Sequence, residues 1–207
     1  MQNLNMISTS VVFLLRQHLA TIELQKEKVE QLLTPELNVG QATDGRIVLG
    51  SMTDQMEVIA GVNRIDVRDR SSKDLRARKV SHVAKGILEA LKGNARAYGI
   101  NYEFETDTPN DTSGAFLLKT FIKDDTRNAI KDLKGAALTL FFNMEGRQAR
   151  IVIEPRRGRP EADKIFFNVN FHMDLGANEP APLEEQLRTE IEGYFKSVKE
   201  ILSKVMK

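Results

Sequence analysis

The sequence predicts an α+β fold in which an antiparallel sheet of about six to seven strands, or two smaller sheets side by side, packs against helices. Two segments carry this prediction. Residues 164–175 alternate apolar and polar side chains, which is typical of a strand with one face on a core. Residues 182–205 repeat apolar side chains at helical spacing, which predicts a long C-terminal amphipathic helix. The helix needs an apolar partner, and the apolar face of the sheet supplies one.

A β-hairpin is predicted before these two segments, because Glu145-Gly146 forms a typical two-residue turn. The turn fixes the register of the two strands. On one face it pairs Leu138 with Ile153, Leu140 with Ile151 and Phe142 with Ala149, and on the other Phe141 with Arg150 and Thr139 with Val152. For Phe141, and for Phe166 in the next strand, we expect burial beneath helices on a second side of the sheet, with base stacking as the alternative.

The C-terminal helix is expected to begin after Pro182 with Glu184-Glu185 and to end among lysines, which suits the helix dipole at both ends. Its apolar stripe is best explained by packing on the sheet. The alternative is the seam of a coiled-coil dimer, because the spacing also tolerates a heptad description.

The rest of the chain alternates between shorter elements. Strands are predicted at 11–15, 46–51, 56–67 and 100–104, with a bulge or a strand end at Asn63-Arg64, and helices at 24–33, between Ser71-Ser72 and Gly93, near Phe116 to Phe121 and from Asp124 to Leu133. We expect a single domain over 1–207, with a division into 1–112 and 113–207 as the alternative. No residue-level repeat supports a duplication.

Composition narrows the function classes. Hydrophobic residues make up 41% and charged residues 29% of the chain, which are ordinary globular values. With no cysteine and three histidines, disulfides, thiolate chemistry, a metal site and a cofactor are not expected. The chain has neither a secretory signal nor an apolar run long enough to span a membrane, so a soluble, cytoplasmic protein without a membrane partner is the expectation. The formal charge of +1 gives no global argument for a nucleic-acid partner.

Two basic segments are candidate binding sites. Arg156, Arg157 and Arg159 lie in a loop bracketed by prolines, where guanidinium groups can bind phosphate or carboxylate in pairs of hydrogen bonds. Arg76 and Lys79 share one face near a helix start, where an anion would offset their charge. If the two segments met in space, a surface for nucleic acid or phosphate would follow; the alternative is that both are simply solvated.

No set of residues predicts catalysis. His172 and Asp174 lie on the same strand face, but a solvated polar row explains them without chemistry. The acidic loop 105–111 is better explained by a capped turn than by a calcium site. The sequence therefore favours a non-catalytic protein-interaction or assembly module, with a homodimer formed through the C-terminal helix or a sheet edge. A nucleic-acid or phosphate-binding module is the alternative.

Overall fold

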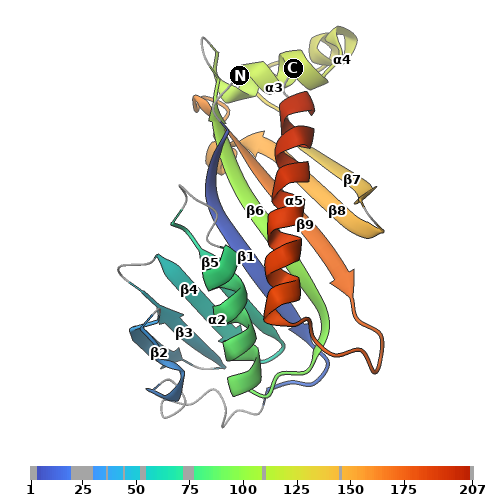
Figure 1. Ribbon diagram of the computed structural model, residues 1–207. Helices are drawn as coiled ribbons and strands as arrows, with labels where there is room; N and C mark the ends of the chain where they lie inside the picture. Colours follow the sequence, from blue (N-terminus) through green and yellow to red (C-terminus); the bar gives the residue numbers. More distant parts are fainter. Residues whose placement is uncertain are drawn as a thin grey trace.

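The computed structural model describes residues 4–19, 30–35, 37–43, 45–51, 55–71, 77–108, 111–144 and 146–205. Its strands form one antiparallel sheet of nine strands in the order β2-β3-β4-β5-β1-β6-β9-β8-β7 (Figure 1). In chain order the strands are β1 (Asn5–Leu15), β2 (Val39–Thr43), β3 (Arg46–Gly50), β4 (Met56–Gly61), β5 (Arg64–Asp69), β6 (Ala95–Asp107), β7 (Leu138–Met144), β8 (Arg147–Pro155) and β9 (Lys164–Asp174). The α+β class and the antiparallel sheet are confirmed.

The predicted strand count was too low, and the described strands form one sheet rather than two. β2 was missed because its sequence, VGQAT, has no alternating apolar pattern. The segment 56–67 holds two strands, since the chain turns at Val62-Asn63 and β5 returns beside β4. The break in the apolar alternation at this point marks a strand end.

Two helices lie across the same face of the sheet. They are α2 (Ala77–Ala90) and α5 (Glu184–Val205), while α3 (Ser113–Phe121), α4 (Asp124–Ala129) and the short 3-10 helix η2 (Arg156–Gly158) lie at one end (Figure 1). The predicted end of the helix at Leu133 is wrong, because α4 ends at Ala129 and Ile130 has an extended backbone. The predicted helix 24–33 and the predicted start of α2 lie mostly outside the described residues; Glu30 to Leu32 are helical.

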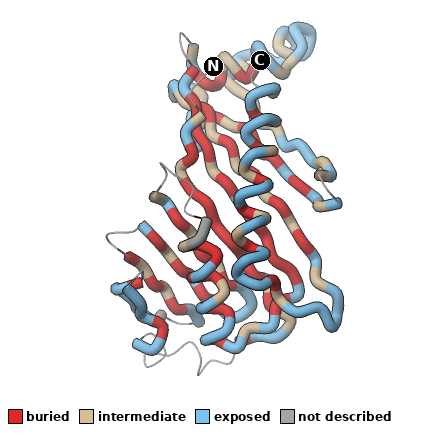
Figure 2. The backbone as a smooth tube through the Cα atoms, viewed as in Figure 1, coloured by how far each residue is buried: buried red, intermediate tan, exposed pale blue. Residues whose placement is uncertain are grey.

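The core forms where α5 crosses the sheet. Figure 2 shows the strands beneath α5 coloured as buried along much of their length. The buried residues of α5 are Leu187, Ile191, Tyr194, Val198 and Leu202. Tyr194 stacks on Phe171 of β9 with ring centroids 4.3 Å apart. The Tyr102 hydroxyl donates a hydrogen bond to the Ile191 carbonyl. Packing of the C-terminal helix on the sheet is confirmed, so this apolar stripe is used within the chain rather than in a coiled-coil seam.

The predicted hairpin register is also confirmed. All five predicted pairs between β7 and β8 are present, including Phe141 opposite Arg150. β9 alternates between buried and half-buried residues along nearly its whole length, as the sequence pattern predicts.

The sheet order repeats a motif in two halves of the chain. β1 and β6 pair at the centre, and outward from them β5, β4 and β3 on one side take the places that β9, β8 and β7 take on the other. α2 follows β5 in the chain as α5 follows β9. The first half adds β2 outside β3, whereas no described strand lies outside β7. β7 is therefore an edge strand at a position where the other half is extended. The division of the chain into domains stays a prediction.

Candidate functional site

The sheet face away from α2 and α5 carries the candidate site, and we call it the open face. No helix of the described part lies over it in Figure 1. A polar row crosses its centre from β5 to β7 through paired residues: Arg68, Ser10, Asn101, Asn170, Arg150 and Phe141. Arg68, Asn101, Asn170 and Arg150 alternate along their strands with buried residues, so the sheet itself holds these side chains on one face.

Most cations in the first half of the open face are neutralised locally. Arg64 pairs with Asp66 at 2.9 Å, and Arg68 lies 3.8 Å from a carboxylate oxygen of Glu103. Arg150 is different, because it makes no hydrogen bond or ion pair with any residue in the described ranges. Near its centre the open face therefore carries the guanidinium of Arg150 without a carboxylate partner among the described residues. The described part of this face does not carry a cluster of unpaired cations there.

A hollow of about 490 Å³ surrounds Arg150, and we call it the open-face depression. Its lining consists of Val12, Leu14, Arg64, Tyr98, Gly99, Asn101, Phe141, Gln148, Ala149, Arg150, Asn170 and His172. Gly99 lies in the floor of the depression and has no side chain. A Cβ at this position would lie only 3.2 Å from the amide nitrogen of Asn170, so a larger residue would crowd that side chain. That nitrogen donates to Asn101 Oδ1 at 2.6 Å. The lining contains no aspartate or glutamate, and Arg150 is its one arginine without a carboxylate partner among the described residues.

His172 and Asp174 do form a pair, with 3.0 Å between His172 Nε2 and Asp174 Oδ1. The His172 ring lines the depression, but the side chain of Asp174 is 88% exposed. The lining offers no serine, threonine or lysine that could act as a nucleophile. His172 therefore forms part of the wall of the depression, and none of these three nucleophile types lies beside it in the lining.

The predicted basic loop is divided by its contacts. Arg156 forms an ion pair with Glu105 of β6, which also accepts a hydrogen bond from Lys164 Nζ at 2.8 Å. Arg157, with a left-handed φ of 56°, and Arg159 are exposed at η2. One of the three arginines is thus held by a carboxylate of the sheet, and two remain open to solvent. Their role in binding stays a prediction.

The second basic segment lies elsewhere in the fold. Arg76 is outside the described residues, and Lys79 is half-buried in α2. α2 packs on α5, β1 and β5, whereas η2 contacts β8 and β9. Binding of an anion or nucleic acid by Arg156, Arg157, Arg159, Arg76 and Lys79 stays a prediction.

Glu105 gives a pH-dependent contribution to stability. Its burial raises the pKa, but hydrogen bonds and charges from Lys164 and Arg156 outweigh burial and leave the pKa below the usual 4.5. A carboxyl with a lowered pKa stabilises the fold above its unfolded pKa, and this contribution is lost as the pH falls through the folded pKa. We expect Glu105→Gln to reduce the free energy of unfolding at pH 7 by about 1 to 3 kcal/mol and much less at pH 3.

Urea unfolding at both pH values measures this difference. Glu57→Gln is the matched control, since Glu57 pairs with Arg70 on the surface, where the expected cost is about 0 to 1 kcal/mol. An equal loss at pH 7 and pH 3 for Glu105→Gln would show that the ion pairs do not cause it.

β7 combines an open edge with exposed apolar side chains. It has the sequence LTLFFNM, without a charge or a proline, and the side chains of Leu140 and Phe141 are 36% and 70% exposed. The expected burial of Phe141 under a second helical layer is wrong, because the described helices that cover the sheet lie on the other face. Phe166 is half-buried. Exposed, uncharged edge strands are templates for pairing with another strand.

The backbone of β7 shows which groups are unpaired. Met144 and Arg147 close a two-residue turn, so they exchange both backbone hydrogen bonds, and the pattern alternates from there. Thr139, Phe141 and Asn143 therefore direct their backbone N–H and C=O groups away from β8. No described residue pairs with this outer edge.

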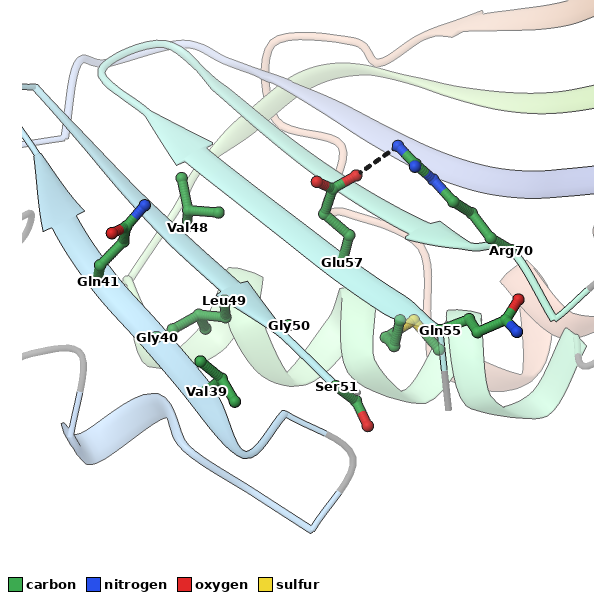
Figure 3. Close-up of a pocket in the computed structure, with 11 residues that line it drawn as sticks. Val39, Gly40, Gln41, Val48, Leu49, Gly50, Ser51, Gln55, Glu57 and Arg70 are labelled. Carbon is green, nitrogen blue, oxygen red and sulfur yellow. Dashed lines mark hydrogen bonds and ion pairs between the residues drawn. The ribbon is translucent and has the colours of Figure 1, made fainter. Parts of the chain in front are cut away.

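A second hollow of about 540 Å³ lies along β2, β3 and β4 (Figure 3). Its charged members, Glu57 and Arg70, satisfy each other at 2.9 Å. Residues 52–54, which follow its Ser51, lie outside the described part of the chain. No function is assigned to this hollow.

Comparisons with known proteins add little. No protein-family model matches the chain, and no curated protein is similar to it. A solved structure described as Methanococcus jannaschii TBP is similar over 96% of this chain and 99% of its own, with a TM-score of 0.36 and 9% identity. A likeness at this level supports no argument about function. Within the described residues, no helix is long and apolar enough to cross a membrane, and no group of three or more acidic or histidine side chains could hold a metal.

Proposed function

We propose that this chain is a non-catalytic assembly module that joins a second copy of itself through the outer edge of β7. The observation that carries the proposal is the unpaired, uncharged edge with Phe141 exposed on it. Strand addition gives affinity through backbone hydrogen bonds, and the side chains that meet across the new pair give specificity. The edge offers both.

A second copy fits this edge in a specific register. If two β7 strands pair antiparallel around a two-fold axis at Phe141, all seven residues of each strand find a partner, and any other symmetric register leaves residues unpaired. Phe141 then meets its own counterpart on the open face. On the opposite face Leu140 meets Phe142, and Leu138 meets Met144. β7 contains no charged residue, so this pairing places no like charges opposite each other and the strand is complementary to itself.

Engineered cysteines test the register, since the chain contains none. Phe141 would lie opposite itself at a Cα–Cα distance of about 5.5 Å, which is within the range of a disulfide. We expect Phe141→Cys to form a disulfide-linked dimer under mild oxidation. Thr139→Cys alone should not, because Thr139 would face Asn143 of the second copy. A mixture of Thr139→Cys and Asn143→Cys should cross-link.

Val39→Cys is the matched control on the opposite edge, where Val39 of β2 is 54% exposed. It should form no disulfide-linked dimer under the same oxidation, because β2 lies far from the pair of β7 strands. Sedimentation velocity of the unmodified chain should show a dimer that dissociates on dilution. A strict monomer, together with equal cross-linking at Val39 and Phe141, would overturn the proposal.

A further inference from the structure

We infer that the open-face depression binds a phosphate ester that carries a planar ring, a ligand of the size and chemistry of a nucleoside monophosphate. This inference shares Phe141 with the proposed assembly, but its anion site lies at Arg150 of β8 and does not depend on that assembly. It is carried by charge, by hydrogen-bond donors and by shape.

The charge in the depression is unbalanced in favour of an anion. Among its lining residues are two arginines and a histidine but no carboxylate. Two of these three groups already have acidic partners, Arg64 in Asp66 and His172 in Asp174, so the unpaired positive charge is that of Arg150. Arg150 has no partner in the described chain, and a guanidinium can give a phosphate two parallel hydrogen bonds. The phosphate is therefore placed on Arg150.

Amide side chains beside Arg150 are already oriented. The Asn101 amide donates to Ser10 Oγ at 3.1 Å and its oxygen accepts from Asn170, so this pair is fixed by its own hydrogen bonds. Gln148 lies next to His172 across the β8–β9 pair and makes no hydrogen bond with a described residue through its side chain. These groups can recognise the polar edge of a ring or a sugar hydroxyl.

The size of the depression and Phe141 argue for more than a bare anion. Its volume of about 490 Å³ is within the range of small-molecule sites, well above what a phosphate alone would fill. Phe141 pairs with Arg150 across β7 and β8 and presents an exposed ring at the border of the depression. A planar ring can stack on such a side chain. Phosphate on Arg150 and a ring on Phe141 together describe the ligand.

Calorimetry with four probes tests the inference: adenosine monophosphate, adenosine, inorganic phosphate and a short single-stranded oligonucleotide with a 5′ phosphate. We expect adenosine monophosphate to bind more tightly than adenosine or phosphate alone. If the oligonucleotide binds as tightly per site as adenosine monophosphate, the ligand is the phosphorylated end of a nucleic acid. If the oligonucleotide does not bind, the ligand is a free nucleotide. Both results support the site.

Arg150→Gln should weaken binding of adenosine monophosphate at least about tenfold and leave the fold intact, because Arg150 is exposed and unpaired. Arg96→Gln is the matched control, since it removes an exposed guanidinium that does not line the depression. Side-chain amide signals of Gln148 and Asn170 should shift in NMR spectra of the titrated protein. No saturable binding, equal binding by Arg150→Gln, or a loss found only in Arg96→Gln would overturn the inference.

Discussion

Replacing Phe171 by alanine is expected to reduce the free energy of unfolding by about 3 to 5 kcal/mol. Phe171 is fully buried in β9, stacks on Tyr194 of α5 and packs against Tyr102 of β6 with the ring edge. Removing the ring leaves a cavity between the sheet and the helix, where the surrounding rings cannot collapse without moving α5. Chemical denaturation monitored by circular dichroism measures the loss.

Phe166→Ala is the matched control, because Phe166 lies on the same strand with its side chain on the open face. It is half-buried, so its loss is expected to be clearly smaller than that of Phe171. The comparison separates the helix-covered face from the open one. Equal losses for the two variants would contradict the assignment of the core to the α5 side.

The elements with strong local patterns could be predicted from the sequence. The turn predicted at Glu145-Gly146 gives the observed register of β7 with β8, although Glu145 itself lies outside the described residues. The alternation in β9 separates its two faces, and both signals depend only on neighbouring residues. The apolar stripe of α5 predicts a buried helix face in the same way. Each of these predictions agrees with the structure.

Contacts between residues far apart in the sequence could not be predicted in this way. The contact of Arg156 with Glu105 joins residues 51 positions apart, and nothing in either local sequence shows it. The exposure of Phe141 depends on which face the helices cover, and an alternating strand does not specify this. The open-face depression draws on six strands. The sequence predicts one part of the site, the pairing of Phe141 with Arg150 in the hairpin. It does not show which other strands lie beside this pair.

The two-half arrangement of the sheet explains why the edges differ. In the first half β2 covers the outer edge of β3 through five residue pairs. In the second half the chain instead forms α3 and α4 between β6 and β7, and β7 remains the last strand. Proteins commonly protect such an edge with a charge or a proline, and β7 has neither. An edge without protection is consistent with one that is covered by a partner.

Opposite charges at Phe141 provide the strongest test of self-pairing. In the two-fold register this position faces its own counterpart, so Phe141→Lys places two ammonium groups together and Phe141→Glu two carboxylates. We expect each variant alone to be monomeric, with a dissociation constant raised at least about tenfold, because like charges directly opposite are destabilising. An equimolar mixture should recover a dimer of one Lys and one Glu chain, since only this combination pairs opposite charges. Native mass spectrometry distinguishes the three species.

The same exchange at Ile59 is the control, because Ile59 is 38% exposed on the open face but lies in β4, inside the sheet. Ile59→Lys and Ile59→Glu should dimerise like the unmodified chain, alone or mixed, since that position has no counterpart across β7. The side chain of Phe141 is 70% exposed, so its replacement should leave the unfolding midpoint of the monomer nearly unchanged. Dimerisation of Phe141→Lys as strong as that of the unmodified chain would place the contact elsewhere. Recovery in the mixture alone would show that position 141 of one copy lies against position 141 of the next, as the pairing of two β7 strands predicts.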